Sequence, residues 1–237
     1  PGGAVLPIYD ELKNHKKILD QFAKRDADIL LGTQMIAKGL DFDNVTLVGV
    51  INADSGLFFP DFRSGERVFQ LIYQVSGRAG RREKPSRAII QTYNPNDVYI
   101  QAAASLNTSK FYNMAMAQRQ ELNYPPFSRI GRIIILGSNK NIVEKKSKKI
   151  FDKLNGSENY KILGPTLAPL EKIRNMWRMH IIIKSLNKKN GYVGELIYNK
   201  IGFSIFEKKW TGVRIILDID PISMMWCIII ICYYFFL

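Results

Sequence analysis

The most informative stretch of the chain is Gln-Val-Ser-Gly-Arg-Ala-Gly-Arg at residues 74–81. Gln74, Arg78 and Arg81 stand at positions i, i+4 and i+7, so on a helix they share one face. The two intervening glycines keep that face open to a ligand. A guanidinium is permanently charged, and its fork matches phosphate oxygens. The spacing alone leaves two interpretations open: a face that binds a triphosphate, or a solvated face with surface ion pairs.

Short apolar runs surround this stretch. They lie at residues 28–32, 45–51 and 88–93, and alternate with helical patterns at 11–24 and 66–79. Continuous apolar runs separated by helices are typical of buried parallel strands. The first part of the chain is therefore predicted to be an α/β domain with a parallel sheet.

The second part of the chain has a different pattern. A helix predicted at residues 109–122 ends at the Tyr-Pro-Pro-Phe of 124–127, because proline cannot continue a helix. Strands are then expected at 130–136, 160–163, 178–184 and 213–219, and helices at 141–154 and 191–201. This βαββαβ order is that of a small ferredoxin-like α+β domain. We place the domains at residues 1–121 and 122–222.

The charge is concentrated in the second part. The whole chain carries a net charge of +13, of which residues 1–121 hold +2 and residues 122–237 hold +11. Such a surplus favours an anionic partner, nucleic acid or anionic lipid. A generally basic proteome is the alternative explanation.

The last residues, 223–237, form an apolar tail. Together with Ile222 they make a run of sixteen residues, shorter than the roughly 20 that a transmembrane helix needs. We expect a non-native or read-through tail, with membrane contact as the alternative, and no membrane partner for the protein. Cys227 and Cys232 are the only cysteines, so no disulfide framework or cysteine metal site is expected, and the composition favours a cytoplasmic protein.

The string Gln-x-x-Gly-Arg-x-Gly-Arg resembles motif VI of the superfamily 2 helicases, whose second motor lobe has a RecA-like fold. The resemblance implies that Gln74, Arg78 and Arg81 face ATP. It also implies that Arg81 is an arginine finger for the developing charge on the γ-phosphate.

A second string, Gly-Thr-Gln-Met-Ile-Ala-Lys-Gly-Leu-Asp-Phe, follows the first predicted strand. Alone it reads as an ordinary strand-to-helix turn, although Thr33, Gln34 and Lys38 supply donors for a phosphate backbone. It is similar to helicase motif V. The resemblance implies that Thr33 and Gln34 contact DNA, and that Gly39 and Asp41 couple DNA to the nucleotide.

Further segments point to one family. Residues 54–67, with the landmarks at 124–127, 163–165 and 218–221, resemble the PriA family of bacterial replication restart helicases over about residues 10–224. The resemblance implies an ATP-dependent 3′–5′ DNA helicase that binds forked DNA and reloads the replicative helicase. It also implies ATP, Mg²⁺ and, in the full-length protein, zinc as cofactors. The implied partners are single-stranded and forked DNA, single-stranded DNA-binding protein and other primosome proteins.

The chain departs from the family in what it lacks. It has no Gly-x-x-x-x-Gly-Lys-[Ser/Thr] loop, no Asp-Glu-x-His box and none of the eight zinc-binding cysteines. We therefore expect the C-terminal part of a longer helicase, inactive on its own, with no metal site of its own. Two alternatives are another superfamily 2 DNA repair helicase and a non-catalytic DNA-binding module.

The basic domain has its own candidate site. Lys172, Arg174 and Arg178 flank Trp177 in a loop expected at residues 171–179. Cations beside an aromatic ring suit a backbone groove with base stacking, so all four are candidate DNA-binding residues. A solvated basic loop around a packed tryptophan is the alternative. The lysines of the helix expected at 141–154 are expected to form a solvated face that adds non-specific affinity.

Overall fold

The structure is a computed structural model, and it describes residues 5–7, 15–32, 45–76, 87–156, 158–186, 192–202, 205 and 212–224. The chain divides into two compact units. Unit 1 comprises Pro1–Phe59 and Arg63–Tyr112, and unit 2 comprises Pro60–Phe62 and Asn113–Leu237. The chain therefore passes from one unit to the other at three points. The boundary that we predict after residue 121 stays a prediction, since these units divide at Tyr112.

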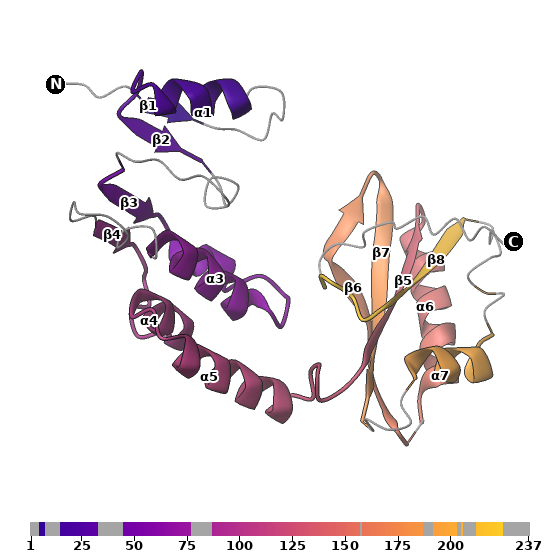
Figure 1. The fold of residues 1–237 in the computed structure, drawn as a ribbon. Helices are drawn as coiled ribbons and strands as arrows, with labels where there is room; N and C mark the ends of the chain where they lie inside the picture. Colours follow the sequence, from indigo (N-terminus) through magenta and orange to yellow (C-terminus); the bar gives the residue numbers. More distant parts are fainter. Residues whose placement is uncertain are drawn as a thin grey trace, which may run out of the picture. The chain divides into compact units, whose positions relative to one another are not determined.

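The described part of unit 1 contains two pairs of parallel strands (Figure 1). The first pair is β1 (Val5–Pro7) with β2 (Ile29–Leu31), and the second is β3 (Leu47–Val50) with β4 (Arg87–Ile90). A helix lies between the partners of each pair, as parallel pairing requires. The three apolar runs are confirmed as parallel strands, but their predicted burial is not, since Ile29, Leu47 and Ile89 are each more than half exposed. β1 was not predicted, because three residues are too few to show a periodicity.

Within the described ranges, the helices of unit 1 follow the expected patterns with two additions, η1 and α4. They are α1 (His15–Ala23), the 3₁₀ helix η1 (Ala53–Gly56), α3 (Ser64–Ser76), α4 (Val98–Ala104) and α5 (Thr108–Glu121), which continues into unit 2. Helix α4 was not predicted, because its seven residues span only two turns. Its start is fixed by Asp97, whose carboxylate accepts hydrogen bonds from the backbone N–H groups of Tyr99 and Ile100 at 2.9 and 3.0 Å.

The core of unit 1 forms where α3 meets α4 and the start of α5. Ile72 on α3 is fully buried, and the ring of Phe69 stacks on Phe111 with 3.7 Å between centroids. Gly65 lies against the ring of Tyr99, where an added Cβ would stand 2.4 Å from ring carbons. The close approach of α3 to α4 therefore depends on glycine at this position.

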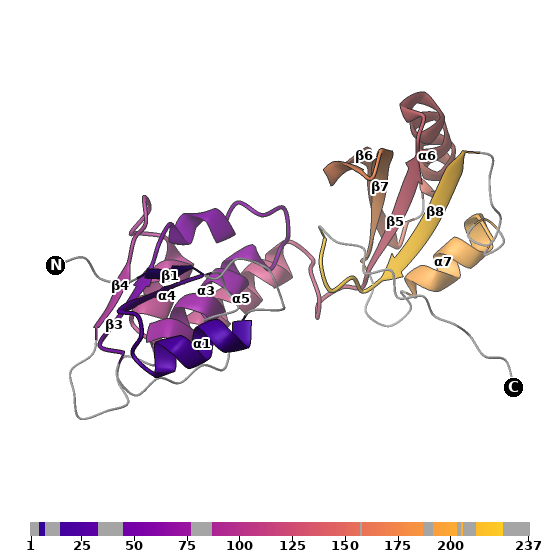
Figure 2. The same ribbon diagram turned by 90° about the horizontal axis from the view of Figure 1, so that it is seen from above.

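Unit 2 is built on one antiparallel sheet with the strand order β6-β7-β5-β8. Among the residues described for this unit, the strands are β5 (Ile130–Gly137), β6 (Tyr160–Ile173), β7 (Met176–Ser185) and β8 (Val213–Ile219), and the helices are α6 (Lys140–Leu154) and α7 (Val193–Lys200). Both helices lie on the same face of the sheet (Figures 1 and 2). The central strands are the first and third of the unit, which is the ferredoxin-like arrangement. The predicted fold class, an α/β lobe followed by a βαββαβ domain, is confirmed.

The helix-covered face holds the main hydrophobic core. Ile133 and Ile135 of β5 and Ile181 and Ile183 of β7 are each fully buried there. They pack against residues of both helices, namely Val143, Ile150, Leu154, Val193, Leu196 and Ile197. Full burial of one such side chain stabilises the fold by about 1.5–3 kcal/mol. This face therefore supplies most of the hydrophobic stabilisation of unit 2.

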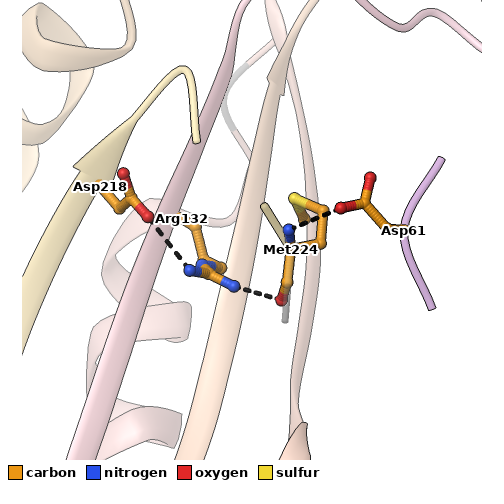
Figure 3. Close-up of polar contacts among 4 residues, drawn as sticks. All are labelled: Asp61, Arg132, Asp218 and Met224. Carbon is orange, nitrogen blue, oxygen red and sulfur yellow. Dashed lines mark hydrogen bonds and ion pairs between the residues drawn. The ribbon is translucent and has the colours of Figure 1, made fainter. Parts of the chain in front are cut away.

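The other face of the sheet is buried too, but it mixes apolar residues such as Ile134 with charged ones. Arg132, Arg178, His180 and Lys184 are all less than one tenth exposed. Their strand register explains why they share a face, since residues directly opposite each other in an antiparallel pair point the same way. Arg132 stands opposite Asp218 of β8, and its guanidinium forms a 3.1 Å ion pair with that carboxylate (Figure 3).

Two predicted boundaries in unit 2 are corrected. Strand β6 runs well beyond residue 163, through register irregularities on either side of Leu167. The Gly-Pro at 164–165 and Pro169 break the alternation, which is why the sequence indicated an early end. The loop expected at 171–179 is instead the tip of the β6–β7 hairpin.

No helix within the described ranges is long and apolar enough to cross a membrane. Of the predicted apolar tail, only Ser223 and Met224 belong to the described residues.

Candidate nucleotide and nucleic-acid interface

Helix α3 carries the first residue of the candidate ATP-facing stripe. Val68, Ile72 and Val75 bury one side of this helix, and Gln74 lies on its exposed side. This is the amphipathic geometry that the spacing predicted. Arg78 and Arg81 lie outside the described residues, so their placement beside Gln74 stays a prediction.

The candidate motif V residues also lie outside the described part of the chain. They are Thr33, Gln34, Lys38, Gly39 and Asp41. Strand β2 ends immediately before them, so the segment begins at the carboxyl end of a parallel strand. Ligands of open α/β sheets bind at that edge.

Sequence reasoning missed the role of Asp54, which lies at the same end of the second strand pair. This buried carboxylate accepts hydrogen bonds from the Thr92 hydroxyl at 2.8 Å and from the Tyr93 N–H at 2.9 Å. A longer bond comes from the Asn94 N–H at 3.3 Å. The bond from the Tyr93 backbone is the largest influence, and together these bonds hold the pKa of Asp54 below its ordinary value despite burial. Asp54 therefore ties η1 to the segment that follows β4.

The β6–β7 hairpin carries the candidate residues of the basic domain. Lys172 and Trp177 are register partners, and Arg174 and Asn175 form the turn between them with φ values of 48° and 64°. Lys172 and Arg174 are exposed, and Trp177 is half-buried. The structure thus brings together two cations and one aromatic ring at the tip of a hairpin.

A third cation joins this tip from α6. The Nζ atoms of Lys140 and Lys172 lie 5.0 and 5.1 Å from the ring centroid of Trp177. Both distances fall within the range of cation–π attraction. The tryptophan is therefore held among ammonium groups while part of its ring remains accessible.

Arg178 lies differently from its neighbours. Its side chain is on the helix-free face of the sheet and is 6% exposed, and its guanidinium donates a 3.1 Å hydrogen bond to the carbonyl of Leu170. A nucleic-acid contact by Arg178 stays a prediction, but the geometry favours a role in holding β6 against β7.

The lysines of α6 lie along its solvated side. Val143, Ser147, Ile150 and Leu154 bury the opposite side. Partial burial lowers the pKa of Lys146, and the neighbouring ammonium groups of Lys149 and Lys153 lower it further. Crowding of like charges on this helix favours an anionic partner, whose binding would relieve the repulsion.

Among the described residues, no group of three or more His, Cys, Asp or Glu side chains could hold a metal ion.

Comparison with known protein families defines the class of the chain. Residues 5–83 match the helicase conserved C-terminal domain, and residues 120–222 match the primosomal protein N C-terminal domain. The chain thus combines a helicase C-terminal lobe with a domain of primosomal proteins.

Curated relatives identify the family. The chain is 43% identical over 213 residues to the replication restart protein PriA of Bacillus subtilis, covering 89% of this chain and 26% of the relative. It is 44% identical over 172 residues to PriA of Synechocystis (72% and 21%) and 39% identical over 229 residues to PriA of Borreliella burgdorferi (95% and 34%). The chain belongs to the PriA family of replication restart proteins. It spans between about a fifth and a third of the length of these relatives.

Proposed function

We propose that this chain supplies part of the ATP site and part of the DNA-binding surface of an ATP-dependent 3′–5′ DNA helicase. In this proposal the helicase binds forked DNA and reloads the replicative helicase there. The observation that carries the proposal is the order of the two matched domains, a helicase lobe followed by a primosomal C-terminal domain. The surplus of basic residues in the second domain supports the DNA-binding part.

The nucleotide role belongs to the first domain. Gln74, Arg78 and Arg81 face ATP in the proposal, and Arg81 stabilises the charge that develops on the γ-phosphate. Gly39 and Asp41 couple this site to DNA. A first motor lobe with a phosphate-binding loop would hold ATP with Mg²⁺. The exposed position of Gln74 on α3 supports this assignment.

The DNA role is divided between the domains. Thr33, Gln34 and Lys38 contact the backbone in the helicase lobe. In the basic domain, the hairpin residues Lys172, Arg174 and Trp177 contact single-stranded DNA. Ammonium groups around an accessible indole ring favour phosphate contacts with base stacking.

The partners and cofactors of the complete helicase belong to the same proposal. We propose single-stranded and forked DNA, single-stranded DNA-binding protein and other primosome proteins as partners of the complete helicase, in the cytoplasm. Zinc is proposed for the complete protein and not for this chain.

A chimaera tests the nucleotide role. This chain would replace the matching C-terminal region of the Bacillus subtilis relative, and DNA-stimulated ATP hydrolysis would be measured. We expect Arg81→Ala to lower the turnover number by about 10³-fold or more, the loss typical of an arginine finger. Arg87→Ala, at the exposed start of β4, is the matched control and should leave turnover unchanged. Equal turnover in the Arg81→Ala and Arg87→Ala chimaeras would refute the assignment.

A further inference from the structure

Three residues form a separate connection between the two units. Pro60–Phe62 belong to unit 2, whereas Phe59 before them and Arg63 after them belong to unit 1. The two ends of this excursion are joined within unit 1, because the Ser64 hydroxyl donates a 2.5 Å hydrogen bond to the carbonyl of Phe59. Ser64 is also the first residue of α3 and is 6% exposed. The base of the excursion is therefore fixed to the helix that carries Gln74.

A chain of polar contacts holds Asp61, at the centre of the excursion, to the rest of unit 2 (Figure 3). Its carboxylate accepts a 3.1 Å hydrogen bond from the backbone N–H of Met224. The carbonyl of Met224 accepts a hydrogen bond from the Arg132 guanidinium, which also pairs with Asp218 at 3.1 Å. Asp61, Arg132 and Met224 are each less than one tenth exposed. Buried charge-assisted hydrogen bonds of this kind are costly to break.

The next residue is held by aromatic contacts. The ring of Phe62 stacks on Tyr124 with 4.3 Å between centroids and 10° between planes. Arg119 lies 5.3 Å from the Phe62 ring, and the Nζ atom of Lys184 lies 3.5 Å from the Tyr124 ring. The stack thus has a cation against each ring. Lys184 also donates a 3.1 Å hydrogen bond to the carbonyl of Leu122, which fixes the stack to β7.

We propose that Pro60–Phe62 are a tether that links the basic domain to helix α3, with Asp61 and Phe62 as positioning residues. The tip of the tether is held by strands β5 and β7 of the DNA-binding sheet, and its base is closed at the first residue of α3. A change in the sheet on DNA binding is therefore transmitted to the helix that presents Gln74 to ATP. The transmission of a change to α3 rests on the proposed helicase function. The attachment of Pro60–Phe62 to unit 2 does not.

Hydrogen exchange of the whole chain at single-residue resolution tests the tether. In Asp61→Ala the amide of Met224 loses its acceptor and should exchange about ten-fold faster, as expected when a buried hydrogen bond to a charged group is lost. Asp61→Asn keeps an acceptor oxygen and should restore most of the protection. Asp152→Ala, which removes an exposed carboxylate on α6, is the matched control. Wild-type protection of Met224 in Asp61→Ala would overturn the tether.

The same measurement with saturating oligothymidine tests the coupling. In the wild-type chain and in Asp152→Ala, DNA should change the exchange of α3 amides at residues 68–72 about three-fold or more, at the low end of coupling through packed networks. In Asp61→Ala that response should be lost while oligothymidine still binds. Bound DNA with no response of α3 in the wild-type chain would overturn the coupling. Failure of the wild-type chain to bind DNA would instead refute the proposed DNA role, with the Met224 result still deciding the tether.

Discussion

The buried His180 should make the stability of unit 2 depend on pH. This residue lies on β7, opposite Ile134, and its side chain is 9% exposed. Among the described residues its Nδ1 atom has no hydrogen-bond partner. Burial lowers the pKa of His180 from 6.5 to about 4, and the positive charges of Arg132 and Arg178 contribute to the shift. The histidine is therefore neutral in the folded protein at neutral pH.

The sign of the effect follows from proton linkage. The unfolded chain takes up a proton near pH 6.5, whereas the folded chain takes it up near pH 4. Protons are then bound mainly by the unfolded state between these values, so stability falls as the pH drops from 6.5 to 4. Each pKa unit is worth about 1.4 kcal/mol, so the loss amounts to roughly 3 kcal/mol at most. Above pH 6.5 the contribution is fully present.

Urea unfolding of the wild-type chain and of His180→Leu isolates this contribution. The free energy of unfolding would be measured for both at several values between pH 7.5 and pH 4. The difference between the two proteins should change by up to about 3 kcal/mol across this range, in favour of the variant at low pH. Taking the difference between the two free energies of unfolding cancels the contribution of carboxylates that titrate in both proteins. A difference that stays constant with pH would refute the argument that burial and the two arginines hold His180 neutral.

Three other predictions concern stability. Ile181→Ala, in the fully buried core, should lower the free energy of unfolding by about 2–5 kcal/mol in urea melts, and a change below about 1 kcal/mol would contradict the packing. Gly65→Ala should destabilise unit 1 by about 1–3 kcal/mol in thermal melts, because the new methyl group clashes with the ring of Tyr99. Gly194→Ala should instead stabilise α7 by about 0.5–1 kcal/mol in the same assay, because no atom lies within 4 Å of its new Cβ. The pKa of Asp54 in the folded protein lies below the ordinary value of 3.8. The ionised carboxylate therefore stabilises the fold above pH 3.8, and this stabilisation is lost as the pH falls through the pKa of the folded protein. Asp54→Asn should therefore flatten acid unfolding in that range, and an unchanged acid profile would count against the hydrogen bonds assigned to it.

The fold was predictable where long elements carry a regular pattern. Helix α6 shows the helical period over 15 residues and strand β5 is a continuous apolar run of strand length, so the βαββαβ order could be read from the sequence. The short elements β1 and α4 gave no such signal. The β6–β7 hairpin was missed because residues 164–165 resemble a strand end, although the strand continues through an irregular register.

The polar contacts were harder to predict, because their partners are distant in sequence. Asp54 binds a segment about 40 residues away, and Arg132 binds residues 86 and 92 positions away. A signal for Arg132 was nevertheless present, since an arginine within an isoleucine-rich strand is buried and requires a partner. Which groups serve as partners depends on the three-dimensional arrangement. They are the carbonyl of Met224 and the carboxylate of Asp218.

Salt-dependent binding of labelled oligothymidine by the whole chain tests the central claim that the basic domain binds DNA. Fluorescence anisotropy would follow binding between about 50 and 200 mM salt, where each phosphate contact contributes roughly one unit to the slope of log affinity against log salt. We predict that the wild-type chain binds at low salt. In Lys172→Gln the slope should be smaller by about one. In Trp177→Ala the binding free energy should weaken by about 1–3 kcal/mol without a change of slope. No binding by the wild-type chain at the lowest salt would contradict the claim. Unaltered affinity and slope in both variants would contradict the assignment of the site to the β6–β7 hairpin.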